Sequence, residues 1–173
     1  MKDLSPPAAR QLGLEKYARI VHQFGGYPFF GTALGIIRNG SVLPQDDDVD
    51  FILPFSSRKK LIDKLVQEPS IRFKLVTDWI VQTIFAESHE EILLDFYFFW
   101  DEGPDVRLPW NFYGTPWRPE THLLVPKRIL RELGTSSSGN FVVSGDSIAR
   151  YLYGDRWTEP MTCLLYTSDA ADE

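Results

Sequence analysis

The sequence predicts an α+β domain in which helices flank a mixed β-sheet. Three observations indicate this class: the order of elements is helix, strand, helix and then a cluster of strands; the helical segments are amphipathic; and 43% of the 173 residues are hydrophobic. A chain of this length is expected to form one domain, and its hydrophobic content is enough for a sizeable core.

Capping and turn residues delimit the predicted elements of the first half. Ser5 and Thr32 are good N-cap residues, and Gly40 can adopt the left-handed conformation that ends a helix. In order, we expect a helix that begins after Ser5 and ends at Gly25, a strand over Tyr27–Phe30, a helix over Thr32–Asn39, a strand over Asp48–Leu53 and a helix from Ser57 to Gln67.

Strands dominate the prediction for the second half. Apolar residues at Ile71, Phe73 and Leu75 alternate with Arg72 and Lys74, which is typical of a half-buried strand. In order, we expect strands over Ile71–Val76, Ile80–Ala86 and Ile92–Trp100, a turn over Asp101–Asp105, an aromatic loop over Leu108–Pro119, a helix over Pro126–Leu133 and a helix over Asp146–Tyr153.

The end of the chain does not read as the completion of a domain. Residues 163–173 are similar to translated sequencing adapters, and an ordinary frayed acidic terminus is the alternative. We therefore expect one domain over residues 1–162, truncated relative to a longer natural protein. The tail and its single cysteine, Cys163, are excluded from functional reasoning.

Charge and hydropathy exclude several classes of protein. The chain has 18 basic and 24 acidic residues, the opposite of the balance in a duplex-binding protein, so we expect no nucleic-acid partner. We expect no transmembrane segment and no signal peptide, because no apolar run approaches the roughly 20 residues that span a bilayer. The single cysteine fits a reducing compartment, and a cytoplasmic location with peripheral membrane contact is compatible with these features.

The feature with the clearest chemical meaning is the acidic run Gln45–Leu53. On a strand, Asp48 and Asp50 point the same way, whereas Val49 and Phe51 point into a core. Two carboxylates one pleat apart repel each other unless a cation lies between them, and oxygen ligands favour Mg²⁺ or Mn²⁺ over zinc. The run therefore predicts a divalent metal site.

Other interpretations of these acidic residues fit the pattern less well. An EF-hand loop from Asp46 would need Gly and Glu where the chain has Phe51 and Ser57, and a solvated acidic turn does not explain the apolar face. A third carboxylate, Asp95, is flanked by apolar strand residues. It is expected either to complete the metal site or to be a capped or salt-bridged residue at the end of a sheet.

A small-residue turn precedes the acidic run. Gly31 and Thr32 stand between a predicted strand and a predicted helix, where backbone N–H groups and a hydroxyl at the positive end of a helix suit a phosphate. Neither a Walker-type Gly-Lys-Ser/Thr motif nor a Gly-x-Gly-x-x-Gly motif is present, so the corresponding nucleotide-binding folds are not supported.

Two blocks together resemble the LicD/fukutin family, a branch of the nucleotidyltransferase fold. They are Gly-Thr-Ala-Leu-Gly-Ile-Ile-Arg over residues 31–38 and Pro-Gln-Asp-Asp-Asp-Val-Asp over residues 44–50. The segment Tyr151–Pro160 resembles the closing motif of the family in shortened form. Two departures are Gln45 in place of the usual Trp, and Phe-Tyr after Asp95 where Ile-Phe-Pro is common.

The resemblance implies a nucleotidyltransferase-like mixed sheet and a metal-dependent transfer. The group transferred would be phosphocholine (phosphorylcholine) or a polyol phosphate, taken from a CDP-activated donor such as CDP-choline to a hydroxyl of a glycan or glycolipid, for example lipopolysaccharide or teichoic acid, with release of CMP. The resemblance assigns Mg²⁺ or Mn²⁺ and catalysis to Asp48, Asp50 and Asp95, and donor binding to Gly31, Thr32 and Arg38.

The sequence alone leaves two other functions open. A glycosyltransferase with an Asp-x-Asp motif would use a nucleotide sugar and attack an anomeric carbon, and an inactive domain would bind metal without turnover. The aromatic residues Trp110, Tyr113 and Trp117 are either packing residues or a cage for a quaternary ammonium head group.

Overall fold

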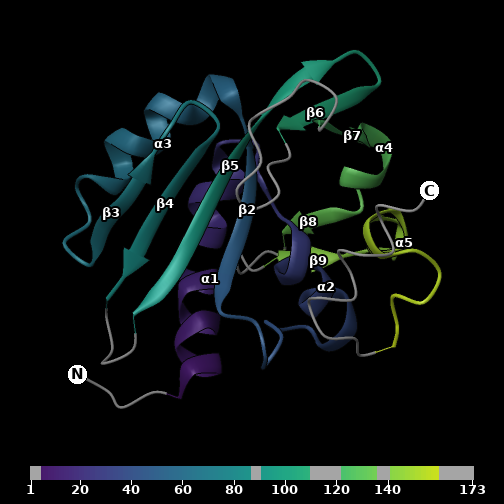
Figure 1. Ribbon diagram of the computed structural model, residues 1–173, viewed down its shortest axis with the longest axis horizontal. Helices are drawn as coiled ribbons and strands as arrows, with labels where there is room; N and C mark the ends of the chain where they lie inside the picture. The colour runs from purple at the N-terminus through teal and green to yellow at the C-terminus, as the bar shows by residue number, and fades with distance from the viewer. Residues whose placement is uncertain (1–4, 87–90, 110–121, 136–140, 160–173) are drawn as a thin grey trace.

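The computed structural model describes residues 5–86, 91–109, 122–135 and 141–159 (Figure 1). The proposed aromatic cage and the tail from Cys163 onward lie outside these residues. The helices are α1 (Pro6–Gln23), α2 (Phe30–Asn39), α3 (Arg58–Leu65), α4 (Lys127–Leu130) and α5 (Ser147–Tyr153), with a 3-10 turn η1 (Phe55–Ser57). The strands are β1 (Tyr27–Pro28), β2 (Asp48–Pro54), β3 (Ile71–Val76), β4 (Ile80–Phe85), β5 (Ile92–Glu102), β6 (Asp105–Pro109), β7 (His122–Pro126), β8 (Leu133–Thr135) and β9 (Phe141–Val143).

A mixed β-sheet forms the centre of the molecule and confirms the predicted α+β class. Its order is β1-β2-β5-β4-β3, and β6 and β7 extend it from the far end of β5. Strands β2 and β5 are parallel and the other neighbours are antiparallel. The parallel pair is central because most residues of Val49–Leu53 and Ile92–Phe99 are buried on both faces of the sheet, and most of them are apolar.

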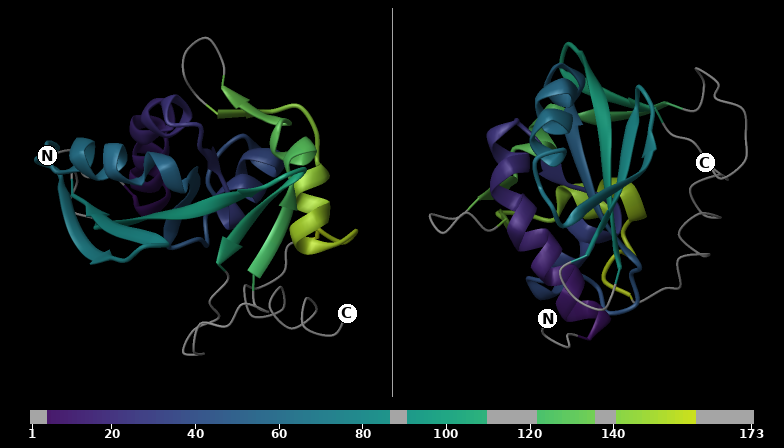
Figure 2. Two further views of the ribbon diagram at one scale, coloured as in Figure 1. Left: turned by 90° about the horizontal axis from the view of Figure 1, so that it is seen from above. Right: turned by 90° about the vertical axis from the view of Figure 1, so that its left-hand side faces the viewer.

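Helices α1 and α3 cover one face of the sheet (Figure 2). Tyr17 of α1 and Leu61 of α3 are completely buried against residues of β2 and β5 such as Phe51 and Phe96, whose rings stack at 5.3 Å. A second core lies on the other face, where α2, α4, α5 and β8 meet Ile52 and the later part of β5. Asp48 and Asp50 of β2 lie on the same face as Ile52 and the second core.

Several local predictions were wrong. Helix α2 begins at Phe30 with Phe29 as its N-cap, so Thr32 is inside the helix and does not cap it. The predicted helix over Pro126–Leu133 is limited to α4, because Leu133 already pairs with Val143 in the β8–β9 hairpin. The expected loop over Leu108–Pro119 begins with the last two residues of β6, Leu108 and Pro109, which pair with β7.

The alternation in Ile71–Val76 did not produce one buried face. Phe73 and Leu75 are 37% and 41% exposed. Strand β3 is the edge of the sheet, and a bulge between Phe73 and Leu75 breaks the period of two.

None of the described helices is long and apolar enough to cross a membrane.

Gly35 fixes the loop that leads into the acidic run. A Cβ at this position would lie 2.5 Å from the Ser41 carbonyl oxygen and 2.8 Å from the Leu43 nitrogen, so only glycine allows the loop to lie against α2. We expect Gly35→Ala to lower the free energy of unfolding by about 1–3 kcal/mol, because backbone atoms must move. Thermal unfolding would measure the loss. Gly134→Ala is the control, since its Cβ would have no neighbour closer than 3.9 Å; equal stability of the two variants would contradict the account.

Candidate active site

Three carboxylates come together on the face of the sheet opposite α1 and α3. Asp48 and Asp50 project from β2, and the parallel register places Asp50 directly beside Asp95 of β5. Oxygen atoms of Asp48, Asp50 and Asp95, here called the acidic trio, all lie within 4.8 Å of one another. Asp50 and Asp95 are only 6% and 2% exposed. The structure thus brings together all three acidic residues that the sequence suggested.

The carboxylates of the trio destabilise one another when all are charged. Burial, followed by repulsion from neighbouring aspartates, raises the pKa of Asp48 from 3.8 to about 7 and raises the pKa of Asp50 well above its ordinary value. Burial also raises the pKa of Asp95, although hydrogen bonds and the charge of Lys74 oppose this effect. A bound cation would remove the repulsion.

The chain holds Asp95 so that one of its oxygens is fixed and the other is free. Gln82 Nε2 donates to Asp95 Oδ2 at 2.8 Å, and the Tyr97 hydroxyl lies 3.5 Å from the same atom. Asp95 Oδ1 is buried and has no hydrogen-bond partner among the described residues. A buried aspartate with one orphaned oxygen, grouped with two further carboxylates, fits the oxygen-only ligand set of Mg²⁺ or Mn²⁺. The acidic trio could therefore hold a divalent metal.

Thr32 connects helix α2 to strand β2, which carries Asp48 and Asp50. Its side chain is completely buried, and its Oγ1 accepts a hydrogen bond of 2.8 Å from the Asp50 backbone N–H. The Phe29 N–H donates to the Asp50 carbonyl oxygen at 3.0 Å. Both backbone groups of Asp50 are thus bound to the turn that begins α2. This arrangement gives the Thr32 hydroxyl a role in holding Asp50 in place.

Gly31 gives space to a fourth carboxylate. A Cβ at Gly31 would lie 2.4 Å from Asp46 Oδ2, an atom that is buried and has no hydrogen-bond partner among the described residues. Burial and the neighbouring Asp47 raise the pKa of Asp46 to about 6. The preceding residue, Phe30, has a left-handed backbone with φ of 43°, which is unusual for a bulky residue and marks strain beside the trio.

Arg38 lies in the last turn of α2, at the opposite end of this helix from Gly31 and Thr32. Its Nη2 donates to the backbone carbonyl oxygens of Trp157 and Glu159. Arg38 therefore connects α2 to the segment after α5, beside a cavity of about 420 Å³ that Gln45 and Trp157 also line.

Sequence reasoning missed several residues that hold the site. Arg10 of α1 is buried, and its Nη2 donates to the Pro44 carbonyl oxygen at 2.8 Å, just before the acidic run. Gln11 accepts from the Val42 N–H at 3.1 Å. Gln82 could have been predicted as a site residue, because it is a polar residue within the largely apolar strand Ile80–Phe85.

The raised pKa values predict how stability depends on pH. The folded protein binds protons on Asp48 between its ordinary pKa of 3.8 and its folded value of about 7, whereas the unfolded chain has lost them. This contribution to stability is therefore present at low pH and is lost as the pH rises through about 7. A pKa difference of one between the folded and unfolded states corresponds to about 1.4 kcal/mol. Asp50 acts in the same direction.

We expect the melting temperature in EDTA to fall between pH 5 and pH 8, and Mg²⁺ to restore it at pH 8 by binding the folded state. Differential scanning fluorimetry of the wild type and Asp48→Asn would test this, because the variant should show a shallower fall. The same pH dependence in EDTA, in Mg²⁺ and in the variant would contradict it.

Comparisons with known proteins agree with this architecture. Among solved structures, the chain is similar to the lincosamide antibiotic adenylyltransferase LnuA bound to lincomycin, with a TM-score of 0.52 and 11% identity over 91% of this chain and 95% of that one. A second similar structure is ANT(2")-Ia in complex with adenylyl-2"-tobramycin, with a TM-score of 0.47 and 15% identity over 86% of this chain and 76% of that one. The first shows a nucleotidyltransferase fold. No curated protein matches the chain.

A family model covers more than half of the chain. The model of the LicD/FKTN/FKRP nucleotidyltransferase domain matches residues 29–127, which include the turn at Gly31, the acidic run and Asp95. This match confirms the resemblance seen in the sequence. The chain therefore belongs to the LicD/FKTN/FKRP family, and the matched region is its nucleotidyltransferase domain.

Proposed function

We propose that the protein transfers phosphocholine or a polyol phosphate from a CDP-activated donor to a hydroxyl group of a glycan or glycolipid and releases CMP. The observation that carries this proposal is the acidic trio, in which Asp50 and Asp95 stand side by side and Asp95 Oδ1 has no partner among the described residues. Family membership supports a nucleotide-using transferase, and the carboxylates supply the means to bind a metal–diphosphate complex.

The residues of the chain have distinct tasks in this reaction. Asp48, Asp50 and Asp95 would hold Mg²⁺ or Mn²⁺, which when bound neutralises negative charge on the phosphate oxygens. Thr32 holds the backbone of Asp50, and Gln82 orients Asp95. The start of α2, at Gly31, offers a positive helix end to the donor.

The bond changes are those of an in-line displacement. The acceptor hydroxyl oxygen forms a bond to the phosphorus that carries the head group, and the bond from this phosphorus to the bridging oxygen breaks. CMP leaves with the bridging oxygen and its electron pair. Asp95, whose carboxylate lies beside Asp50, helps to remove the hydroxyl proton.

The identity of the released nucleotide tests the proposal. The purified protein would be incubated with CDP-choline, CDP-ribitol or CDP-glycerol, Mg²⁺ and a panel of glycan acceptors, and nucleotides would be separated by chromatography. We expect CMP from one of these donors, with no release in EDTA. Release of an intact nucleoside diphosphate from a nucleotide sugar would instead indicate a glycosyltransferase. Thermal stabilisation by Mg²⁺ without turnover of any donor would indicate a metal-binding domain without activity.

A further inference from the structure

A bulge in β3 adds a lysine to a strand that lies two positions from β5, the strand of Asp95. In the pairing of β3 with β4, Phe73 stands opposite Thr83 and Leu75 stands opposite Gln82, so Lys74 is the extra residue. Lys74 thus has no partner of its own on β4 and stands next to the Leu75–Gln82 pair. Bulges of this kind redirect a side chain and are common next to active sites.

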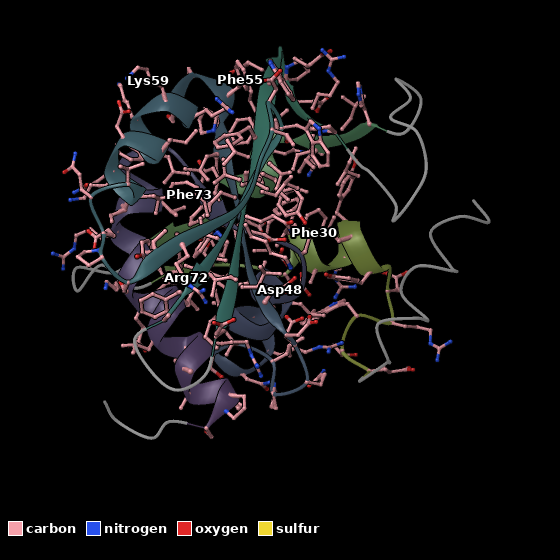
Figure 3. All side chains as sticks on the ribbon, turned by 60° about the vertical axis from the view of Figure 1, so that its left-hand side comes forward. Phe30, Asp48, Phe55, Lys59, Arg72 and Phe73 are labelled. Atoms are coloured by element: carbon pink, nitrogen blue, oxygen red, sulfur yellow. The ribbon has the colours of Figure 1, made fainter. Side chains whose placement is uncertain are left out.

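The sheet then connects Lys74 to Asp95. Gln82 pairs with Asp95 in the register of β4 and β5, and its side chain donates to the Asp95 carboxylate. Two strand spacings, about 10 Å in all, separate β3 from β5. The Lys74 ammonium acts across this distance, since its charge lowers the pKa of Asp95 against the larger effect of burial. In Figure 3, Arg72 and Phe73 mark β3 and Asp48 marks the trio.

Lys74 differs from Arg10, Arg38 and Arg72 in having neither an ion pair nor a hydrogen bond from its side chain to another described residue. It is exposed, and no carboxylate pairs with it among the residues that the structure describes. Arg72 forms an ion pair with Glu91, Arg10 is bound to the Pro44 carbonyl oxygen, and Arg38 is bound to carbonyl oxygens of the segment after α5. The side chain of Lys74 is therefore available to a ligand.

We propose that Lys74 binds a non-bridging phosphate oxygen of the donor diphosphate. This inference rests on the proposed function and adds a binding residue to it. A diphosphate above the acidic trio brings further negative charge to a site that already holds three carboxylates, and the trio itself provides no cation. Lys74 supplies a positive charge from the strand beyond Gln82, where a charge-assisted hydrogen bond to phosphate can form.

Binding of a diphosphate without turnover tests this role. Isothermal titration calorimetry would measure the affinity of the full chain for inorganic pyrophosphate, and then for CDP, in the presence of Mg²⁺. Lys74→Gln removes the charge, Lys74→Arg keeps it, and Lys60→Gln is the matched control. Lys60 is exposed on α3, which covers the other face of the sheet.

We expect Lys74→Gln to weaken pyrophosphate binding by about tenfold to a hundredfold, the usual effect of one hydrogen bond to a charged group. Lys74→Arg should retain most of the affinity, and Lys60→Gln should bind like the wild type. Equal binding by Lys74→Gln and the wild type, or no pyrophosphate binding by the wild type, would overturn the inference. A Lys74-dependent site in a protein that releases no CMP would preserve the inference and contradict the proposed function.

Discussion

Asp50→Asn is expected to abolish transfer while the fold survives. The variant loses one proposed ligand atom and one negative charge at Asp50, the more buried of the two trio members on β2. Loss of a metal ligand in a phosphoryl-transfer site should reduce the rate by about 10³-fold or more. Asp48→Asn should have a similar effect. The measurement is CMP release at saturating Mg²⁺ and saturating donor.

Stability distinguishes this loss from misfolding. Without metal at pH 8, Asp50→Asn should melt at or above the wild-type temperature, because it removes the burial of one charge and the repulsion between aspartates, the two causes that raise the pKa of Asp50. Asp63→Asn on α3, an exposed residue that pairs with Lys59, is the matched control and should be fully active. Near-normal activity of Asp48→Asn or Asp50→Asn would contradict the assignment.

Asp95→Asn should also reduce CMP release severely, by about 10²-fold to 10³-fold. An asparagine at this position can still accept the hydrogen bond from Gln82 through its carbonyl oxygen, while its NH₂ group replaces the free Oδ1. The substitution therefore removes the proposed ligand atom with little change in packing. The affinity for Mn²⁺ and the rate of CMP release should both fall.

A comparison with Gln82→Met separates positioning from ligation. Loss of the Gln82 amide leaves Asp95 charged but less firmly oriented, so this variant should retain more activity than Asp95→Asn. If Asp95→Asn retained the wild-type rate and the wild-type Mn²⁺ affinity, Asp95 would be a structural residue and the metal site would depend on β2 alone.

The strand that carries the acidic run, and the face of its two aspartates, could be predicted because both follow from neighbouring residues in the sequence. The alternation of Asp48 and Asp50 with Val49 and Phe51 indicates both a strand and its buried face, and the structure follows it. The pairing of Asp50 with Asp95 depends on the parallel register of two strands that are distant in the sequence. The residue pattern suggested that Asp95 needed a partner but could not provide this register.

Other features depend on tertiary contacts that no local pattern reveals. Thr32 reads as an N-cap, yet α2 starts at Phe30 because the turn is bound to the backbone of Asp50. The alternation over Ile71–Val76 reads as a regular strand, yet a bulge between Phe73 and Leu75 leaves Lys74 without a partner on β4. Short strands such as β8 form because they pair with a neighbouring strand, here β9, and their own few residues do not predict them.

The most direct test of the acidic trio as a metal site is diffraction from crystals grown with Mn²⁺ and a CDP-activated donor, recorded where manganese scatters anomalously. The account predicts an anomalous peak coordinated by carboxylate oxygens of Asp48, Asp50 and Asp95, with the donor diphosphate in contact with the ion. A peak bound only by Asp46 and Asp47, or no peak between β2 and β5, would contradict it.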